Sequence, residues 1–198
     1  MKNSIQLLFL FLIFNAVSYS QNILPSNTFI QACYNNTECY GISNSAQIFL
    51  NNNTGDFLIQ MDFNGFRIGN DTLDDWLNDL SKSCFVFTGN IHTKELTGII
   101  NNNSQPVVVN GKIDFNGYSK PYNLEVVFFR QSREGTLISN SAQNPLDRIA
   151  ISSMQLVFHA KDFHIGDRAH HFKKTIRITI TRGYINEWTP EVNLLIKQ

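Results

Sequence analysis

Residues 106–129, PVVVNGKIDFNGYSKPYNLEVVFF, carry the clearest structural pattern in the chain. Apolar residues alternate with polar ones in its first half, and the second half repeats the alternation. A period of two is typical of a strand with one buried face. The apolar face consists of Val107, Val109, Gly111, Ile113 and Phe115 in the first half and of Tyr122, Leu124, Val126 and Phe128 in the second. The stretch therefore predicts a β-hairpin.

The break between the two halves is residues 116–121, NGYSKP. Asn116 and Gly117 accept positive φ angles at little cost, which suits a hairpin turn. Pro121 has a fixed φ and no amide hydrogen, so we expect it to set where the returning strand begins. Near the end Val127 and Phe129 make the polar face apolar, which indicates that another part of the chain covers it.

The same alternation recurs on both sides of this hairpin. Upstream it predicts a second hairpin around a turn at residues 51–55, then a strand at residues 85–91 with a short continuation at residues 96–100. Downstream it predicts strands at residues 149–158 and 175–182, with a polar loop at residues 131–145 and an irregular or briefly helical stretch at residues 162–174. The apolar positions are Ala46, Ile48, Leu50, Phe57, Ile59, Met61, Phe63, Phe85, Phe87, Gly89, Ile91, Met154, Leu156, Phe158, Ile176, Ile178 and Ile180.

Residues 71–80, DTLDDWLNDL, change to a helical period. Leu73, Trp76, Leu77 and Leu80 fall on one stripe of a short helix. The acids at Asp71, Asp74 and Asp75 suit the positive end of the helix dipole, which explains them without a catalytic role. We expect the Trp76 segment to plug one end of the folded domain.

The N-terminus has the layout of a secretory signal peptide. Residues 1–20 contain Lys2, an apolar run at residues 5–14 and small residues before Gln21. We expect cleavage after about Ser20 and a periplasmic or secreted protein without a stable membrane anchor. Residues 21–40 are rich in Asn without a clear period and predict an irregular N-terminal segment, so the folded domain is expected at residues 41–190.

Composition limits the fold and the partners. The chain has 198 residues with 16 basic and 16 acidic side chains, which gives no electrostatic reason to expect nucleic acid as a partner.

Short, evenly spaced strands with one apolar face, and no alternation of strands with helices, favour a mainly β protein. We predict an antiparallel β-barrel of about eight strands with one or two short helices, because closure removes exposed strand edges.

The three cysteines are interpreted in the light of export. Cys33 and Cys39 lie close together in a polar stretch, and an oxidising compartment makes them a disulfide candidate. Cys84 remains unpaired in a strand-like run, where we expect a buried thiol that behaves as a small hydrophobic side chain.

Candidates for catalysis or metal binding are weak. His159, His164, His170 and His171 cluster in sequence, but their spacing matches no zinc-ligand pattern. The sequence contains no Gly-rich phosphate loop, no Ser nucleophile motif and no paired Cys motif. We therefore expect neither an enzyme nor a metal site, and an enzyme using the histidines with Asp62 or Asp162 is the weakest alternative.

The order of these segments resembles the YceI-like proteins, exported lipocalin-like barrels that bind polyisoprenoid lipids. The hairpin residues 109–121, VNGKIDFNGYSKP, are similar to the distinctive hairpin of that family. Residues 71–91 are similar to its short helix and the strand that follows, and residues 156–178 to its closing strands. The resemblance covers about residues 41–185 and implies a lipocalin-like barrel with an isoprenoid inside.

Two departures separate the chain from the family pattern. Ser83 and Cys84 stand where the family usually has a Pro before the strand, and the early strands lack the family's His signature. No headgroup-binding residue is therefore carried over. Lys120 and Arg130 are the residues considered for a pyrophosphate at the barrel mouth.

The resemblance implies that inward apolar side chains contact the lipid. The candidates are Phe57, Phe63, Phe85, Phe87, Val109, Phe115, Leu124, Val126, Phe128 and Ile178. A barrel filled by the same side chains, acting as a protein-interaction or structural module, remains the alternative. We expect no cofactor other than a bound isoprenoid lipid, and a homodimer stays open.

Overall fold

The predicted hairpin is formed by strands β5 (Pro106–Phe115) and β6 (Tyr118–Arg130). Asn116 and Gly117 make the turn with φ angles of 51° and 78°, which a two-residue hairpin turn requires. The returning strand begins at Tyr118, and Pro121 lies within it opposite Lys112. Our expectation that Pro121 sets the start of the strand is wrong, because the two-residue turn alone fixes the register.

The computed structural model describes residues 26–34, 37–63, 71, 74–75, 84–100, 106–130, 149–164, 175–190 and 192, with backbone alone for residues 32–34, 37–39, 130 and 187. The remaining elements are β1 (Ser26–Tyr34), β2 (Thr37–Leu50), β3 (Asp56–Met61), β4 (Phe85–Asn90), α3 (Thr93–Ile100), β7 (Ile149–His159), the 3-10 helix η3 (Ala160–Phe163) and β8 (Thr175–Glu187).

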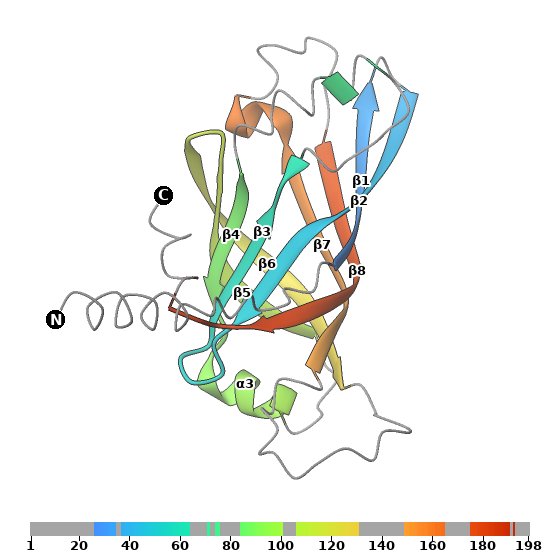
Figure 1. The fold of residues 1–198 in the computed structure, drawn as a ribbon. Helices are drawn as coiled ribbons and strands as arrows, with labels where there is room; N and C mark the ends of the chain where they lie inside the picture. The colour runs from blue at the N-terminus through green and yellow to red at the C-terminus, as the bar shows by residue number, and fades with distance from the viewer. Residues whose placement is uncertain are drawn as a thin grey trace, which may run out of the picture.

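The eight strands form a closed antiparallel barrel in chain order (Figure 1). β8 completes the barrel by pairing with β1 through residues such as Ile30 and Ile178. Past Ser26, where β1 begins, β8 pairs in parallel with β2, from Ile48 opposite Ile185 to Leu50 opposite Glu187. The predicted fold class is confirmed.

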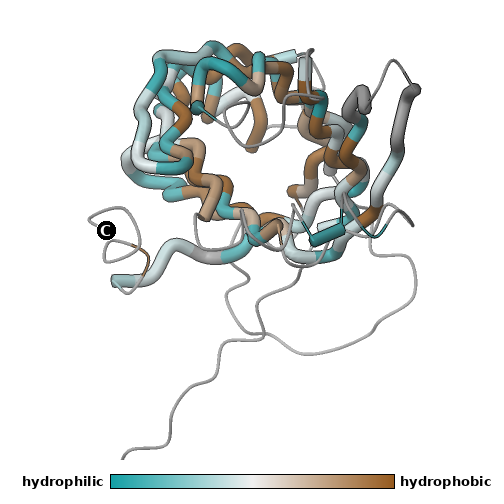
Figure 2. The backbone as a smooth tube through the Cα atoms, turned by 90° about the horizontal axis from the view of Figure 1, so that it is seen from above, coloured by the Kyte–Doolittle hydropathy of each residue, from teal (hydrophilic) through white to brown (hydrophobic). Residues whose placement is uncertain are grey.

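Alternation sorts the side chains between the two sides of the wall. In β5, Val109 and Ile113 are buried, whereas Val108 and Lys112 are exposed. Viewed from above, the hydrophobic residues gather on the inner side of the ring (Figure 2). The barrel interior is therefore the hydrophobic core, and it contains one continuous cluster to which every strand contributes.

The first strand corrects our prediction of an irregular segment at residues 21–40. β1 and the start of β2 occupy most of this stretch, so the barrel begins at Ser26 and not at residue 41. The inward side of β1 carries the buried residues Ser26, Thr28 and Ile30, whereas Phe29 is 45% exposed on the outer side. Two of the inward residues are polar and an outward one is aromatic, so the strand lacks the usual apolar alternation.

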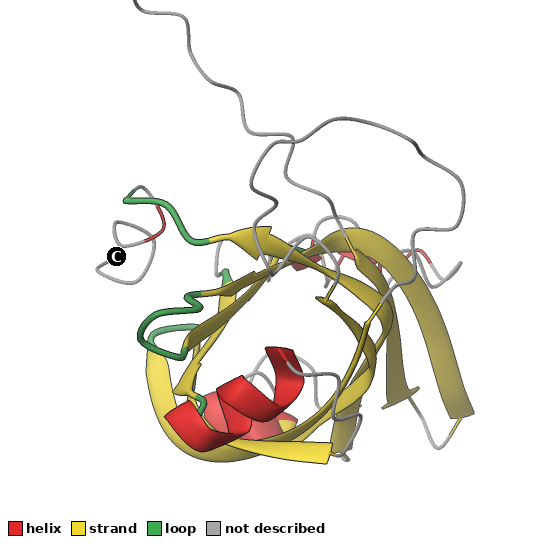
Figure 3. Ribbon diagram, turned by 90° about the horizontal axis from the view of Figure 1, so that it is seen from below, coloured by secondary structure: helices red, strands yellow, loops and turns green. Residues whose placement is uncertain are grey.

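The helix α3 corrects the strand continuation predicted at residues 96–100. Leu96 and Ile99 are its buried residues, and the helix begins with a hydrogen bond from the Leu96 amide to the His92 carbonyl (2.9 Å). Seen from below, α3 lies across part of the lower opening of the barrel (Figure 3). One end of the barrel is therefore covered by this helix.

The helix predicted at residues 71–80 is only partly within the described residues. Asp71, Asp74 and Asp75 have helical backbone, but its apolar stripe, including Trp76, lies outside them. Within the described part of the chain, no helix is long and apolar enough to cross a membrane.

A second, smaller cluster lies on the outside of the wall. It consists of Phe49 on β2, Leu58 on β3 and Val192, with Val86 and Trp188 packed against it. We call it the outer cluster. The segment that follows β8 thus covers outward apolar residues of the first strands.

Candidate functional site: the apolar interior of the barrel

The structure brings the ten predicted lipid-contacting residues together inside the barrel. Each belongs to the interior cluster, and none is more than 2% exposed. They come from β4, β5, β6 and β8, and from β3 and the residues just after it. The residues are Phe57, Phe63, Phe85, Phe87, Val109, Phe115, Leu124, Val126, Phe128 and Ile178. Contact with a lipid stays a prediction for all ten.

The interior also includes residues that the sequence analysis did not nominate. Leu96 and Ile99 of α3, and Phe163 of η3, are buried in the same cluster. Strand periodicity does not identify them because they lie on short helical turns. Phe158 is also in the cluster. Its alternation with Met154 and Leu156 predicted an apolar position, but it was not named as a lipid contact.

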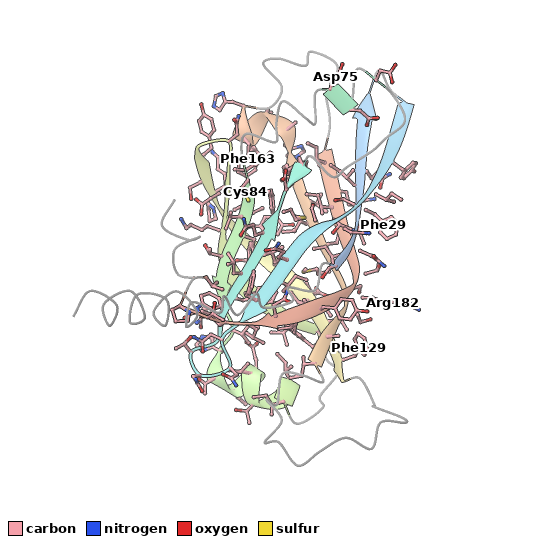
Figure 4. The ribbon with its side chains drawn as sticks, viewed as in Figure 1. Phe29, Asp75, Cys84, Phe129, Phe163 and Arg182 are labelled. Carbon is pink, nitrogen blue, oxygen red and sulfur yellow. The ribbon has the colours of Figure 1, made fainter. Side chains whose placement is uncertain are left out.

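Five phenylalanines fill the upper end of the interior, the end that carries η3. Phe63 stacks on Phe115 with ring centroids 5.0 Å apart, and Phe85 stacks on Phe158 at 5.7 Å. Phe163 meets Phe158 edge to face at 5.3 Å and Phe115 at 6.0 Å. Figure 4 shows Phe163 near the top of the barrel. This end is therefore occupied by aromatic side chains in contact with one another.

A second aromatic group lies further into the barrel. Phe57 contacts Phe87 and Phe128, each with a centroid separation of 6.3 Å, and Phe87 contacts Tyr122 at 6.4 Å. Beside them Gly89 and Gly111 stand directly opposite each other on β4 and β5. A Cβ added at Gly111 would lie 2.9 Å from Cζ of Phe87, so the glycines make room for that ring.

Polar groups inside the wall are few and hydrogen-bonded. Among the described residues, the buried polar ones are Ser26, Thr28 and Ser43, and none is charged. The Tyr184 amide donates to Oγ of Ser26 (3.0 Å), and Oγ1 of Thr28 donates to the Ser26 carbonyl (3.1 Å). The interior therefore suits an uncharged apolar guest and presents no buried acid or base.

The residues considered for metal or acid–base chemistry form no metal-binding group among those that the structure describes. Within the described part of the chain, no three His, Cys, Asp or Glu side chains could hold a metal ion. His159 and His164 are exposed, and His164 stacks on Tyr118 at 4.3 Å. Asp62 is exposed and Asp162 is half-buried on η3. His170 and His171 lie outside the described residues.

Cys84 is exposed, which corrects our expectation of a buried thiol. It precedes β4, so its side chain points outward, and Sγ lies 3.5 Å from the Met61 carbonyl oxygen, to which it donates. Desolvation by neighbouring atoms raises the pKa of the Cys84 thiol, and the Asp62 carboxylate raises it further. Hydrogen bonds from Gln60 and the Met61 backbone act in the opposite direction.

The other two cysteines lie on the β1–β2 hairpin. The backbone register pairs Cys33 with Glu38 and Cys39 with Ala32. The two are therefore close in the hairpin but not directly opposite each other. Their side chains are outside the described residues, and the disulfide stays a prediction.

The two cations considered for one pyrophosphate lie at opposite ends of β6. Lys120 pairs with Ile113 near the turn, and Arg130 pairs with Ile149 at the other end. Ten residues of extended strand separate them by about 33 Å. Our interpretation that both meet one headgroup is wrong.

Among the comparisons with known proteins, the one with solved structures supports the fold. No protein-family model matches the chain, and a search of the curated proteins finds no match. A polyisoprenoid binding domain from Saccharophagus degradans, implicated in plant cell wall breakdown, matches with a TM-score of 0.55 and 13% identity, over 78% of this chain and 90% of that chain. Burkholderia cenocepacia BcnA matches with a TM-score of 0.52 and 13% identity, over 78% and 93%.

A YceI protein from Campylobacter jejuni also matches, with a TM-score of 0.41 and 14% identity over 69% of this chain and 77% of that chain. At such identities the similarity concerns the fold. The likeness to the YceI-like proteins that the hairpin suggested is confirmed at that level, and the chain has the barrel fold of the polyisoprenoid binding domain.

Proposed function

We propose that this protein is a non-catalytic binding protein that holds a polyisoprenoid or a similar long-chain amphiphile inside its barrel. The observation that carries the proposal is the interior itself, which is lined by apolar side chains and has no buried charge among the described residues. An isoprenoid chain is a hydrocarbon, and its transfer from water to such an environment is favourable. The structural likeness to a polyisoprenoid binding domain supports the same choice of ligand.

The direct test is to identify what the protein carries. Native mass spectrometry after mild purification is expected to show a co-purified lipid, and organic extraction should release a long-chain isoprenoid or a related amphiphile. Protein stripped of lipid should take up an added polyprenol with one molecule per barrel. A protein that is repeatedly empty and takes up no polyprenol would contradict the proposal.

A matched pair of variants tests whether the lipid binds in the interior or on the outer surface of the barrel. Phe57 is buried between Phe87 and Phe128, whereas Phe29 is exposed on the outer side of β1. Phe57→Leu frees room inside, so it is expected to shift the bound lipids towards bulkier chains. Phe29→Leu makes the same chemical change outside and should leave the bound lipids unchanged. Equal lipid profiles in the two variants would place the ligand elsewhere.

The second candidate function is a filled barrel that serves as an interaction or structural module. It is favoured by one observation, the five phenylalanines in mutual contact at the upper end. Those rings occupy one end only, and the remaining interior is mostly aliphatic. Repeated failure of polyprenol uptake would favour this candidate.

The proposal includes export, which rests on residues 1–20 alone. The lysine, apolar run and small residues of this segment are those of a signal peptide. N-terminal sequencing of the protein recovered from its native host is expected to begin at about Gln21. A mature protein that retains Met1 would contradict export by this route.

A further inference from the structure

The barrel wall is interrupted between β6 and β7. These strands pair only from Val126 opposite Met154 to Arg130 opposite Ile149. Both strands lie wholly within the described residues, yet residues 118–125 of β6 have no backbone partner on β7. By contrast, β5 pairs with β6 along its whole length, and β8 pairs with β7 from Ala150 to His159. In Figure 1 the two strands lie side by side at the lower end and separate towards η3.

Tyr122 bridges the interruption with its side chain. Its hydroxyl oxygen accepts a hydrogen bond from the Val157 amide at 2.8 Å. In a continuous ladder that amide would donate to a β6 carbonyl. Tyr122 is half-buried, and its ring packs against Phe87 of the interior cluster. One side chain therefore both closes the wall and contacts the core.

The interruption is framed at both ends. Below it, Val126 and Met154 form the last ladder pair. Above it, η3 crosses from β7 to the β5–β6 turn, where Nδ2 of Asn116 donates to the Phe163 carbonyl at 3.0 Å. The ring of His164 also stacks on Tyr118 at the start of β6. The unpaired stretch is thus a bounded window in the wall, which we call the β6–β7 window.

The inner sides of the window are apolar. Leu124 on β6 and Leu156 on β7 are fully buried, and Phe158 is 6% exposed. The two ends of the barrel are less open to a ligand, because five phenylalanines fill the upper end and α3 buries Leu96 and Ile99 at the lower end. At the window, by contrast, the backbone ladder is absent and the Tyr122–Val157 hydrogen bond links the two strands.

We propose that the apolar ligand enters and leaves the barrel through the β6–β7 window and that Tyr122 is the gate. This inference rests on the proposed function, since it assigns a route to the lipid. Opening consists of breaking the Tyr122–Val157 hydrogen bond and separating two strand segments that no backbone ladder holds together. A hydrocarbon chain can then slide between Leu124 and Leu156 into the interior.

The first test measures the rate of lipid exchange. Phosphatidylcholine vesicles that contain a fluorescent polyprenol are mixed with lipid-free protein, and transfer is followed in both directions. Tyr122→Phe keeps the ring against Phe87 but removes the hydroxyl. We expect uptake and release to be about three- to tenfold faster, the range that corresponds to one neutral hydrogen bond, with unchanged affinity at equilibrium. Tyr184→Phe, at an exposed tyrosine on the paired β7–β8 seam, should exchange at the wild-type rate.

The second test locks the window. Continuing the ladder register by one residue places Glu125 opposite Gln155, and both are exposed. Glu125→Cys with Gln155→Cys, in a Cys84→Ser background, allows a disulfide across the first unpaired position. Oxidation is expected to slow exchange at least tenfold, and reduction should restore it. Thr97→Gly, at an exposed position of α3 outside the interior cluster, weakens the helix at the lower end and should leave the rate unchanged.

The results of these tests distinguish failure of the proposed lipid binding from failure of the proposed route. Wild-type protein that takes up no polyprenol would contradict the proposed function. Wild-type uptake together with a normal rate in Tyr122→Phe, or with no effect of the oxidised cross-link, would contradict the window as the route. Faster exchange in Thr97→Gly would assign the route to the lower end instead.

Discussion

Gly89 and Gly111 are two residues of the wall at which the backbone leaves no room for a side chain. A side chain at Gly111 would meet the backbone carbonyl of Thr88 and would lie 2.8 Å from Cα of Gly89. Backbone atoms cannot move aside as the end of a flexible side chain can. The pair thus allows β4 and β5 to approach while the ring of Phe87 lies over them.

Gly111→Ala is therefore expected to destabilise the barrel by about 1–3 kcal/mol or more, the usual cost of overpacking. Urea unfolding measures the change. Gly117→Ala is the matched control, because a Cβ there meets nothing within 4 Å and only its φ of 78° is unfavourable. A variant at Gly111 as stable as the one at Gly117 would contradict the close approach.

Cys84 gives a second prediction at this scale. Because desolvation and Asp62 raise the pKa of its thiol, less thiolate is present at pH 8 than in an unperturbed cysteine, and alkylation should be slower. Asp62→Asn removes the nearby negative charge, so it should lower the pKa and accelerate alkylation. Mass spectrometry of the peptide that contains Cys84 gives the rate. Asp56→Asn, at the far end of β3, should leave the rate unchanged.

At the scale of elements, α3 is a short helix that depends on the core beneath it. Eight residues are too few for a stable isolated helix, so Leu96 and Ile99 must supply the stabilisation. Leu96→Ala should cost about 2–5 kcal/mol, the range for truncation of a buried leucine. Lys94→Ala, at an exposed position of the same helix, should change the unfolding free energy little. Equal effects in a denaturant titration would contradict the packing of α3 on the interior cluster.

The elements that the sequence predicted well are those in which pattern and environment agree. β5 and β6 alternate regularly and Asn116-Gly117 is a strong turn signal, so β5 and the end of β6 were predicted close to their bounds. The start of β6 was not, because the strand begins at Tyr118, before Pro121. In α3, Leu96, Gly98 and Ile100 imitate a period of two, while the buried pair Leu96 and Ile99 follows a helical period. The two patterns coincide over so few residues that periodicity alone cannot distinguish them.

β1 was missed for a different reason. Its inward positions include Ser26 and Thr28, whose hydroxyls find partners across the barrel seam and within the strand. A buried polar residue costs little when it is hydrogen-bonded, so the strand does not need an apolar face along its whole length. The partner of Ser26 is 158 positions away in the chain, and no local pattern can reveal it.

Taken as a whole, the described part of the molecule has two separate hydrophobic clusters with different predicted roles. The interior cluster is the proposed lipid site, and the outer cluster holds the segment after β8 against β2 and β3. The sequence predicted the ten candidate interior residues because they continue the alternation of the strands, which Phe63 extends just beyond the end of β3. The β6–β7 window was not predictable, since it depends on where two neighbouring strands separate.

Trp188→Ala tests the separation of the clusters. It removes a half-buried ring from the outer cluster, so we expect a loss of about 1–3 kcal/mol of stability and more binding of a hydrophobic dye to the exposed Phe49 and Leu58. Polyprenol uptake by the folded protein should be unchanged. Val108→Ala, at an exposed residue outside this cluster, should affect neither quantity. Loss of uptake in folded Trp188→Ala protein would show that the two clusters are coupled.

The seam at which β8 meets β1 and β2 determines when this barrel can form during synthesis. β1 is synthesised long before its partner residues 177–181 on β8. Until then the growing sheet keeps a free edge that can pair with another nascent chain. A chain truncated before β8 keeps this free edge, and we therefore expect it to aggregate.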